Sequence, residues 1–171
     1  MDPALRPNRH FWWVASLCSM LPDIDAIGLR MGVPYADLWG HRGMTHSLFC
    51  AAVLGILAAA YFRQPWRQGW KLASLLFVVT ASHGALDALT NGGLGVAFFS
   101  PFDPHRYFFP WRPIQVSPIG AHAFLGARGM SVLLSEICWV WGAALFLFAL
   151  PRAVRRWRRA QSMRDSGTFE I

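Results

Sequence analysis

The feature that most constrains the fold of this chain is an uncharged run of sixteen residues, SLFCAAVLGILAAAYF, from Ser47 to Phe62. As a helix this run would be about 24 Å long, which with its flanks is enough to cross a bilayer. Two further runs, 72–90 and 130–150, are also long enough to span, whereas the run 11–21 is too short to do so alone. The sequence therefore predicts an all-α fold, a polytopic transmembrane helical bundle with three full spans and one short or partial N-terminal span.

The composition supports a membrane protein and argues against two other classes. Only 15% of the residues are charged and 54% are hydrophobic, whereas soluble domains carry about 25% charged residues. Cys18, Cys50 and Cys138 lie singly in apolar stretches without a CxxC spacing, so a disulfide framework is excluded. Six arginines gather in 152–164 directly after an apolar run, which is typical of a topology signal. No nucleic-acid partner is expected, although the net charge is +7.

The basic residues divide unequally between the two sides of an alternating topology. Of the 16 lysines and arginines, eleven fall on one side, namely Arg6, Arg9, Arg63, Arg67, Lys71, Arg152, Arg155, Arg156, Arg158, Arg159 and Arg164. Because cytoplasmic loops carry the excess of such residues, we expect this side to face the cytoplasm. Residues 1–151 would then form the membrane-embedded domain of an inner-membrane protein, and residues 152–171 a basic cytoplasmic tail.

The same topology places two loops, 22–46 and 91–129, on the outer side. The longer one is rich in proline and aromatic residues, which break helices and suit the membrane interface. We expect this Pro/aromatic-rich outer loop to act as a lid or re-entrant cover rather than as a free linker.

Three short segments, PDID, HRGMTHS and SHGALD, each hold two acids or imidazoles that could bind a metal. The predicted topology brings the three segments to one membrane face. The candidate metal ligands in them are Asp23, Asp25, His41, His46, His83 and Asp87.

Spacing gives two of these segments a geometric interpretation. His83 and Asp87 are four residues apart, so on a helix they point the same way, and ionisable residues inside a span are functional or paired by default. In an extended segment, Asp23 and Asp25 would lie on one side. Imidazoles with carboxylates favour a divalent metal ion, with zinc as the first candidate and manganese or another transition metal as alternatives.

Several neighbouring residues have open or simpler roles. Arg42 could bind an anionic substrate group or stabilise developing charge, or it could anchor a lipid head group. Thr45 and Ser47 could orient the metal ligands or cap the helix that starts there, and capping is the expected role. Asp103 and His105 could reach the site from the long loop. The roles of these two residues and of Glu136 stay open.

Each segment also has a purely structural interpretation. PDID could be a proline turn with solvated acids, and His41 and His46 could cap a span at the interface. His83 and Asp87 could form a buried hydrogen-bonded pair. Six such residues on one face of a small bundle are difficult to explain by these roles alone.

The combination of PDID, HRGMTHS at the head of a span, and SHGALDALTNGG followed by SPF resembles the membrane-bound metal-dependent hydrolases that include the LexA-regulated inner-membrane proteins. The similarity covers about residues 11–150. It implies a multi-span inner-membrane protein with a proposed metal-dependent hydrolase activity, and its polar motifs match the six candidate ligands. The resemblance departs at His10, which lacks the threonine that precedes a histidine in the first helix of family members. Either the start is shortened or the site has one ligand fewer.

The function expected from the residues and from the resemblance is hydrolysis of an ester or phosphoester by a metal-activated water. Asp23, Asp25 and Arg42 are the candidate catalytic residues, and a carboxylate among Asp23, Asp25 and Asp87 that does not bind the metal could act as the general base. Membrane lipids are the expected surroundings, and the substrate is expected to be lipid-like. The alternative is a non-enzymatic metal-binding membrane protein or transporter.

Overall fold

The structure is a computed structural model that describes residues 8–118 and 124–167. The chain divides into two compact units, Met1–Ile119 and Gly120–Ile171, which are described separately below. Within the described ranges every regular element is a helix, and β-structure is limited to two isolated bridges. The all-α prediction is therefore confirmed.

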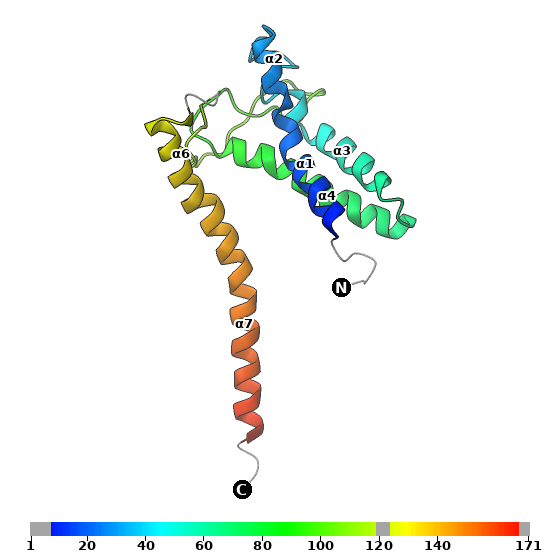
Figure 1. The fold of residues 1–171 in the computed structure, drawn as a ribbon, viewed down its shortest axis with the longest axis vertical. Coiled ribbons are helices and arrows are strands. Elements are labelled where there is room, and N and C mark those ends of the chain that lie inside the picture. The colour runs from blue at the N-terminus through cyan, green and yellow to red at the C-terminus, as the bar shows by residue number, and fades with distance from the viewer. Residues whose placement is uncertain (1–7, 119–123, 168–171) are drawn as a thin grey trace. The chain divides into compact units, whose positions relative to one another are not determined.

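The first unit contains three longer helices and three short helical segments (Figure 1). The longer helices are α1 (Arg9–Met20), α3 (Leu48–Tyr61) and α4 (Trp66–Ala88). The short segments are the 3₁₀ turn η2 (Leu21–Asp25), α2 (Ala26–Arg30) and the 3₁₀ turn η3 (Met44–His46).

Local sequence signals set where these helices begin. The Asn8 side chain accepts a hydrogen bond of 2.8 Å from the Phe11 backbone N–H and caps α1. Ser47 caps α3 in the same way by accepting from the Cys50 backbone N–H at 3.0 Å, which confirms its predicted capping role. Pro65 immediately precedes α4, where its missing N–H costs nothing.

The segment PDID corrects one expectation. It is not extended, because α1 runs directly into the 3₁₀ turn η2, where the fixed φ of Pro22 suits the first helical positions. With about three residues per turn, positions two apart no longer share a side. Accordingly, Asp23 is exposed and Asp25 is buried.

The core of the first unit lies where α1, α3 and α4 pack together. Its buried side chains are small, apart from two leucines of α4, and comprise Ala15, Cys18, Ala59, Leu72, Ala73 and Leu76. Gly55 lets α3 approach α4 closely, because a Cβ at this position would lie 2.8 Å from both the Ala73 carbonyl oxygen and the Phe77 backbone nitrogen.

We expect Gly55→Ala to lower the free energy of unfolding by about 1–3 kcal/mol, because the added methyl group meets backbone that cannot give way. The measurement is thermal unfolding of the detergent-solubilised protein. Gly69→Ala in α4 is the matched control, since its nearest neighbour would be the Gln64 carbonyl oxygen at 3.7 Å. Equal stability of the two variants would contradict close α3–α4 packing.

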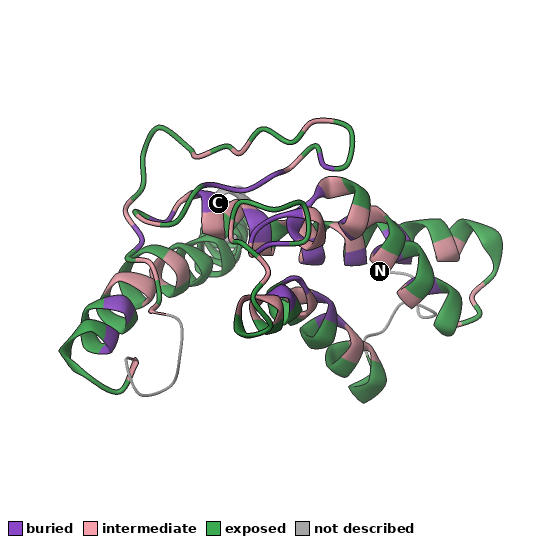
Figure 2. Ribbon diagram, turned by 90° about the horizontal axis from the view of Figure 1, so that it is seen from above, coloured by how far each residue is buried: buried purple, intermediate pink, exposed green. Residues whose placement is uncertain are grey.

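Large apolar side chains cover much of the outer surface of these three helices. Trp12, Trp13, Ile56, Leu57 and Val78 are each half or more exposed. Figure 2 shows the exposed residues on the outer sides of the helices and the buried ones where helices face each other. Apolar surface of this extent marks a membrane or protein contact.

The second unit is a long helical segment formed by α6 (Ala127–Glu136), the π-helical turn η4 (Ile137–Trp141) and α7 (Gly142–Gly167). Of the described residues, its stretch Ala127–Ser162 is the one helix long and apolar enough to cross a membrane, and α3 is a shorter apolar helix. The helix continues through Pro151 into the basic residues, so the predicted tail begins within a helix.

The chain after α4 forms an irregular loop that packs against the segment preceding α3. Its two bridges pair Thr90 with Ile114 and Val96 with Tyr107. The Ala97 backbone N–H donates to the Arg42 carbonyl oxygen at 3.0 Å. The described part of the predicted loop therefore packs on the HRGMTHS segment, and the helix that follows starts at Ala127, slightly before the predicted end of the loop at 129.

Candidate metal centre

Three helical segments meet at one end of the first unit. The turn η2 follows the end of α1, the turn η3 precedes the start of α3, and α4 ends at Ala88. The turns η2 and η3 contact each other, and both contact α4. This packing brings all six candidate ligands together.

The first group consists of Asp23, His46, His83 and Asp87. One possible ligand atom from each lies within 4.8 Å of the other three. His46 Nε2 is 3.1 Å from Asp87 Oδ2 and 3.6 Å from Asp23 Oδ1, and His83 Nε2 is 3.3 Å from Asp23 Oδ1 and 3.8 Å from Asp87 Oδ2. Two imidazoles and two carboxylates thus face a common point.

Three atoms of this group are buried without a hydrogen-bond partner in the described part of the chain. They are His46 Nε2, His83 Nε2 and Asp87 Oδ2. Buried polar atoms are nearly always satisfied, so convergent unsatisfied ones mark a place where a bound ion or water would satisfy them. Two imidazoles and two carboxylates are a suitable donor set for zinc or a related transition metal. The residues therefore fit the ion that the sequence predicts.

The side chains of this group differ in their access to solvent. Asp23 is 54% exposed, whereas His46 is fully buried. His83 and Asp87 are 20% and 17% exposed. The open side of the group therefore lies at Asp23, between η2 and α4.

A second group, Asp25, His41 and His46, adjoins the first and shares His46 with it. Asp25 Oδ1 accepts from His41 Nδ1 at 2.6 Å, and Asp25 Oδ2 accepts from the Arg42 backbone N–H at 3.1 Å and from the Thr45 hydroxyl. His46 Nδ1 lies 3.1 Å from Asp25 Oδ2. Unlike the first group, the buried carboxylate at its centre is hydrogen-bonded through both oxygens.

Arg42 is buried and points inward. Its Nη2 atom donates to Asp87 Oδ1 at 2.9 Å, and Nη1 donates to Thr90 Oγ1 and to the Gly92 carbonyl oxygen, both at 3.0 Å. Its φ of 63° lies in the left-handed region, which is costly for a residue with a side chain. Such strain persists only where the surroundings enforce it, often at functional sites.

Arg106 was not identified from the sequence, yet it connects the long loop to the site. Its guanidinium donates to the carbonyl oxygens of Tyr35, Asp37 and His41 at 3.0, 3.0 and 2.9 Å. Its acceptors are backbone carbonyl oxygens, which every residue has, so the sequence does not reveal these hydrogen bonds. The one sequence signal for Arg106 is its position next to Asp103 and His105 in the proline-rich loop.

The neighbouring candidates have different outcomes. Asp103 and His105 pair with each other, at 2.5 Å between Oδ1 and Nδ1, and neither belongs to the two groups. Thr45 does not cap α3 as predicted, because its hydroxyl bonds Asp25 instead. Glu136 belongs to the second unit.

The charges of the two groups stabilise one another. Burial alone would raise the pKa of the Asp23 carboxyl, but the nearby imidazoles of His46 and His83 hold it well below its usual range. Burial likewise opposes ionisation of Asp25, whose pKa is lowered by hydrogen bonds from His41, His46 and Thr45. The pKa of His46 is raised to about 10, because the surrounding carboxylates of Asp23, Asp25 and Asp87 outweigh burial. A metal ion would therefore compete with a proton here.

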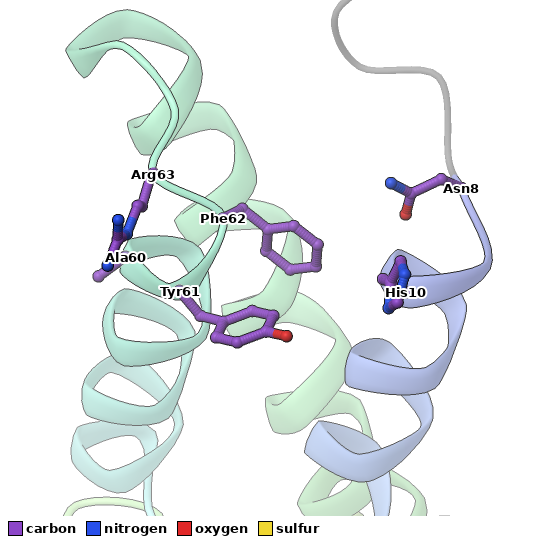
Figure 3. Close-up of a pocket in the computed structure, with 6 residues that line it drawn as sticks. All are labelled: Asn8, His10, Ala60, Tyr61, Phe62 and Arg63. Carbon is purple, nitrogen blue, oxygen red and sulfur yellow. The ribbon is translucent and has the colours of Figure 1, made fainter.

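A cavity of about 600 Å³ lies at the other end of these helices (Figure 3). Asn8 and His10 of the α1 start and the residues Ala60 to Arg63 at the α3 end line it. None of these residues belongs to the two groups, and His10 lies at the start of α1, whereas η2 with Asp23 and Asp25 follows the end of that helix.

Comparison with known proteins shows which family the sequence of this chain matches. The chain matches the YdjM inner membrane protein family over residues 2–161. It is 36% identical over 135 residues to the inner membrane protein YbcI of Escherichia coli strain K12, with 78% of each chain covered. It is 38% identical over 98 residues to the inner membrane protein YdjM of the same strain and to that of Shigella flexneri, with 48% of each chain covered. No solved structure matches the chain.

Proposed function

Because the chain belongs to the YdjM inner membrane protein family, we propose that it acts in a bacterial inner membrane as a metal-dependent hydrolase. The ion would be held by Asp23, His46, His83 and Asp87. The observation that carries this proposal is the convergence of three buried, unsatisfied ligand atoms on one point. Zinc is the first candidate, because it prefers imidazole with carboxylate ligands.

The side chains around this point have separable roles. A bound transition metal would lower the pKa of water and polarise the scissile ester or phosphoester. Asp23 is the carboxylate at the open side, and its Oδ1 faces the imidazoles, so its other oxygen is placed to accept a proton from the attacking water. Asp25 already accepts three hydrogen bonds and is buried, which argues against its use as the base.

Arg42 fits a positioning role better than the substrate-binding role that the sequence suggested. The hydrogen bonds of its guanidinium are directed to Asp87, Thr90 and Gly92 within the fold, and its side chain is 5% exposed. It would hold Asp87 in place and balance its charge, and it has no free surface for an anionic substrate.

The placement of charged and apolar residues supports a polytopic arrangement. The acids and imidazoles lie at one end of the first unit, and Arg9, Arg63, Arg67 and Lys71 lie at the other ends of the same helices. Between the two ends the outer surface is largely apolar. With the positive end in the cytoplasm, the site would face the outer side and residues 152–171 would remain cytoplasmic.

The surroundings of the site favour a lipid-like substrate. Met20, Ile24 and Leu86 are exposed apolar residues close in sequence to Asp23 and Asp87 on the open side. A molecule with an apolar chain and a polar ester or phosphoester could contact both kinds of surface. Membrane lipids would then be both the surroundings and the source of the substrate.

We expect the purified protein in detergent micelles to hydrolyse a chromogenic phosphodiester or a long-chain acyl ester. Chelation should abolish turnover, and added zinc should restore it. Asp23→Asn should lower kcat by about 100-fold or more if this carboxylate is the base. Hydrolysis that is indifferent to chelation would contradict the proposal, and metal binding without turnover of either substrate would favour the non-enzymatic alternative.

A further inference from the structure

We propose that Thr45, held by Asp25, fixes the proton of His46 on Nδ1 and thereby reserves Nε2 for a single metal ion. This inference rests on the proposed metal centre and concerns how the chain builds it. It assigns Thr45 and Asp25 as positioning residues and excludes a second ion in the group Asp25, His41 and His46.

The hydrogen bonds of Thr45 establish which atoms donate and which accept around His46. Its hydroxyl oxygen contacts both Asp25 Oδ2 and, at 3.1 Å, His46 Nδ1. An ionised carboxylate only accepts hydrogen bonds, so the single hydroxyl hydrogen of Thr45 goes to Asp25. Thr45 Oγ1 and Asp25 Oδ2, which both lie 3.1 Å from His46 Nδ1, are then acceptors, so Nδ1 carries the proton. A neutral imidazole protonated at Nδ1 presents its lone pair at Nε2.

The opposite nitrogen of the same ring faces the first group. His46 Nε2 is buried, has no hydrogen-bond partner in the described chain, and lies 3.1 Å from Asp87 Oδ2. Metal-binding histidines commonly donate their second N–H to a carboxylate or another acceptor, which sets the tautomer and the ring orientation. Here the Asp25 carboxylate and the Thr45 hydroxyl that is bonded to it are the acceptors that face Nδ1.

A second ion is disfavoured because the adjoining group is already satisfied. An ion bound to His46 Nδ1 would have to displace the proton donated to Thr45, and an ion on Asp25 would compete with hydrogen bonds from His41, Arg42 and Thr45. None of the buried unsatisfied atoms in the described chain belongs to Asp25 or His41. In the described chain, the buried candidate ligand atoms without a hydrogen-bond partner all lie on the Nε2 side of His46.

Arg42 supports both the positioning residue Asp25 and the proposed ligand Asp87. The backbone N–H of Arg42 donates to Asp25 Oδ2 at 3.1 Å, and its guanidinium donates to Asp87 Oδ1 at 2.9 Å. The latter bond leaves Asp87 Oδ2 as the oxygen that faces the imidazoles. The left-handed conformation of Arg42, with φ of 63°, directs the backbone and the side chain of one residue to these two carboxylates.

The test compares zinc binding by the full chain in detergent with that by three variants. We expect one zinc ion per wild-type chain, and an affinity about 10–100-fold lower for Thr45→Val, which removes the hydroxyl but keeps the shape. Thr45→Ser should restore the affinity to within a few-fold. Thr80→Val is the matched control, since Thr80 is also buried but donates to the Leu76 carbonyl oxygen of its own helix, at 2.9 Å.

A second measurement does not depend on the variants folding. Long-range proton–nitrogen NMR of zinc-loaded wild-type protein should show His46 protonated at Nδ1 and zinc-bound at Nε2. Two ions per chain, zinc bound at Nδ1, or unchanged affinity in a folded Thr45→Val variant would each overturn the inference while leaving a metal centre in place. Absence of metal binding by the wild type would instead overturn the proposed function, and this inference with it.

Discussion

Replacing Asp23 by asparagine and His83 by glutamine together is expected to lower the affinity for zinc by about 100-fold or more. Loss of an outer partner of a metal ligand typically costs 10–100-fold, so loss of two of four direct ligands costs more. These two residues are the more exposed acid and the more exposed imidazole of the first group, and neither bonds Arg42, so the fold should tolerate the change. Zinc titration with a competing chelator measures the affinity.

The matched control for this variant makes the same chemical changes elsewhere. Asp103→Asn with His105→Gln alters an exposed acid–imidazole pair that lies outside both groups. We expect this control to bind zinc as the wild type does. If the two double variants lost zinc equally, binding would reflect surface acids and imidazoles in general, and the assigned ligand set would be wrong.

Arg42→Met is expected to lower the free energy of unfolding of the metal-free protein by about 3–5 kcal/mol, the typical cost of removing one partner of a buried ion pair. Methionine retains the apolar bulk of the side chain but leaves Asp87, Thr90 and the Gly92 carbonyl oxygen without their donor. Thermal unfolding in the presence of a chelator measures this effect separately from metal binding.

Two further variants identify the cause of that loss. Arg30→Met removes an exposed arginine of α2 and should change the stability by less than about 0.5 kcal/mol. Arg42→Lys keeps a cation but not the planar fork that reaches several acceptors, so an intermediate loss is expected. If Arg42→Met were as stable as Arg30→Met, Arg42 would not be the buried support described above.

Much of the helical fold was predictable because apolar runs and helix-start signals are local. The run from Ser47 to Phe62 became α3 with Ser47 as its cap, and the run at 72–90 falls largely within α4, which begins earlier, at Trp66. The extent of the last helix was less predictable. Pro151 and the arginines after it end the apolar pattern without ending the helix.

The site was predictable as a set of residues, because three short segments each carry two acids or imidazoles and the predicted topology brings these segments to one membrane face. The division of these residues into two groups was not predictable. Asp23 and Asp25 are separated because η2 is a 3₁₀ turn. His46 belongs to both groups because each of its ring nitrogens faces a different one. The contributions of Arg106 and of the Arg42 backbone were also hidden, since they act through main-chain atoms.

The central claim, that His46 and His83 with Asp23 and Asp87 hold one transition metal ion, is tested most directly by X-ray absorption at the zinc edge of the purified wild-type protein. We predict a first shell of nitrogen and oxygen at about 2.0–2.2 Å, with multiple scattering from two imidazoles and no sulfur. A sulfur shell at about 2.3 Å would assign the ion to cysteine, and a spectrum of hexahydrated zinc would show that the cluster holds no ion. Either result would contradict the account.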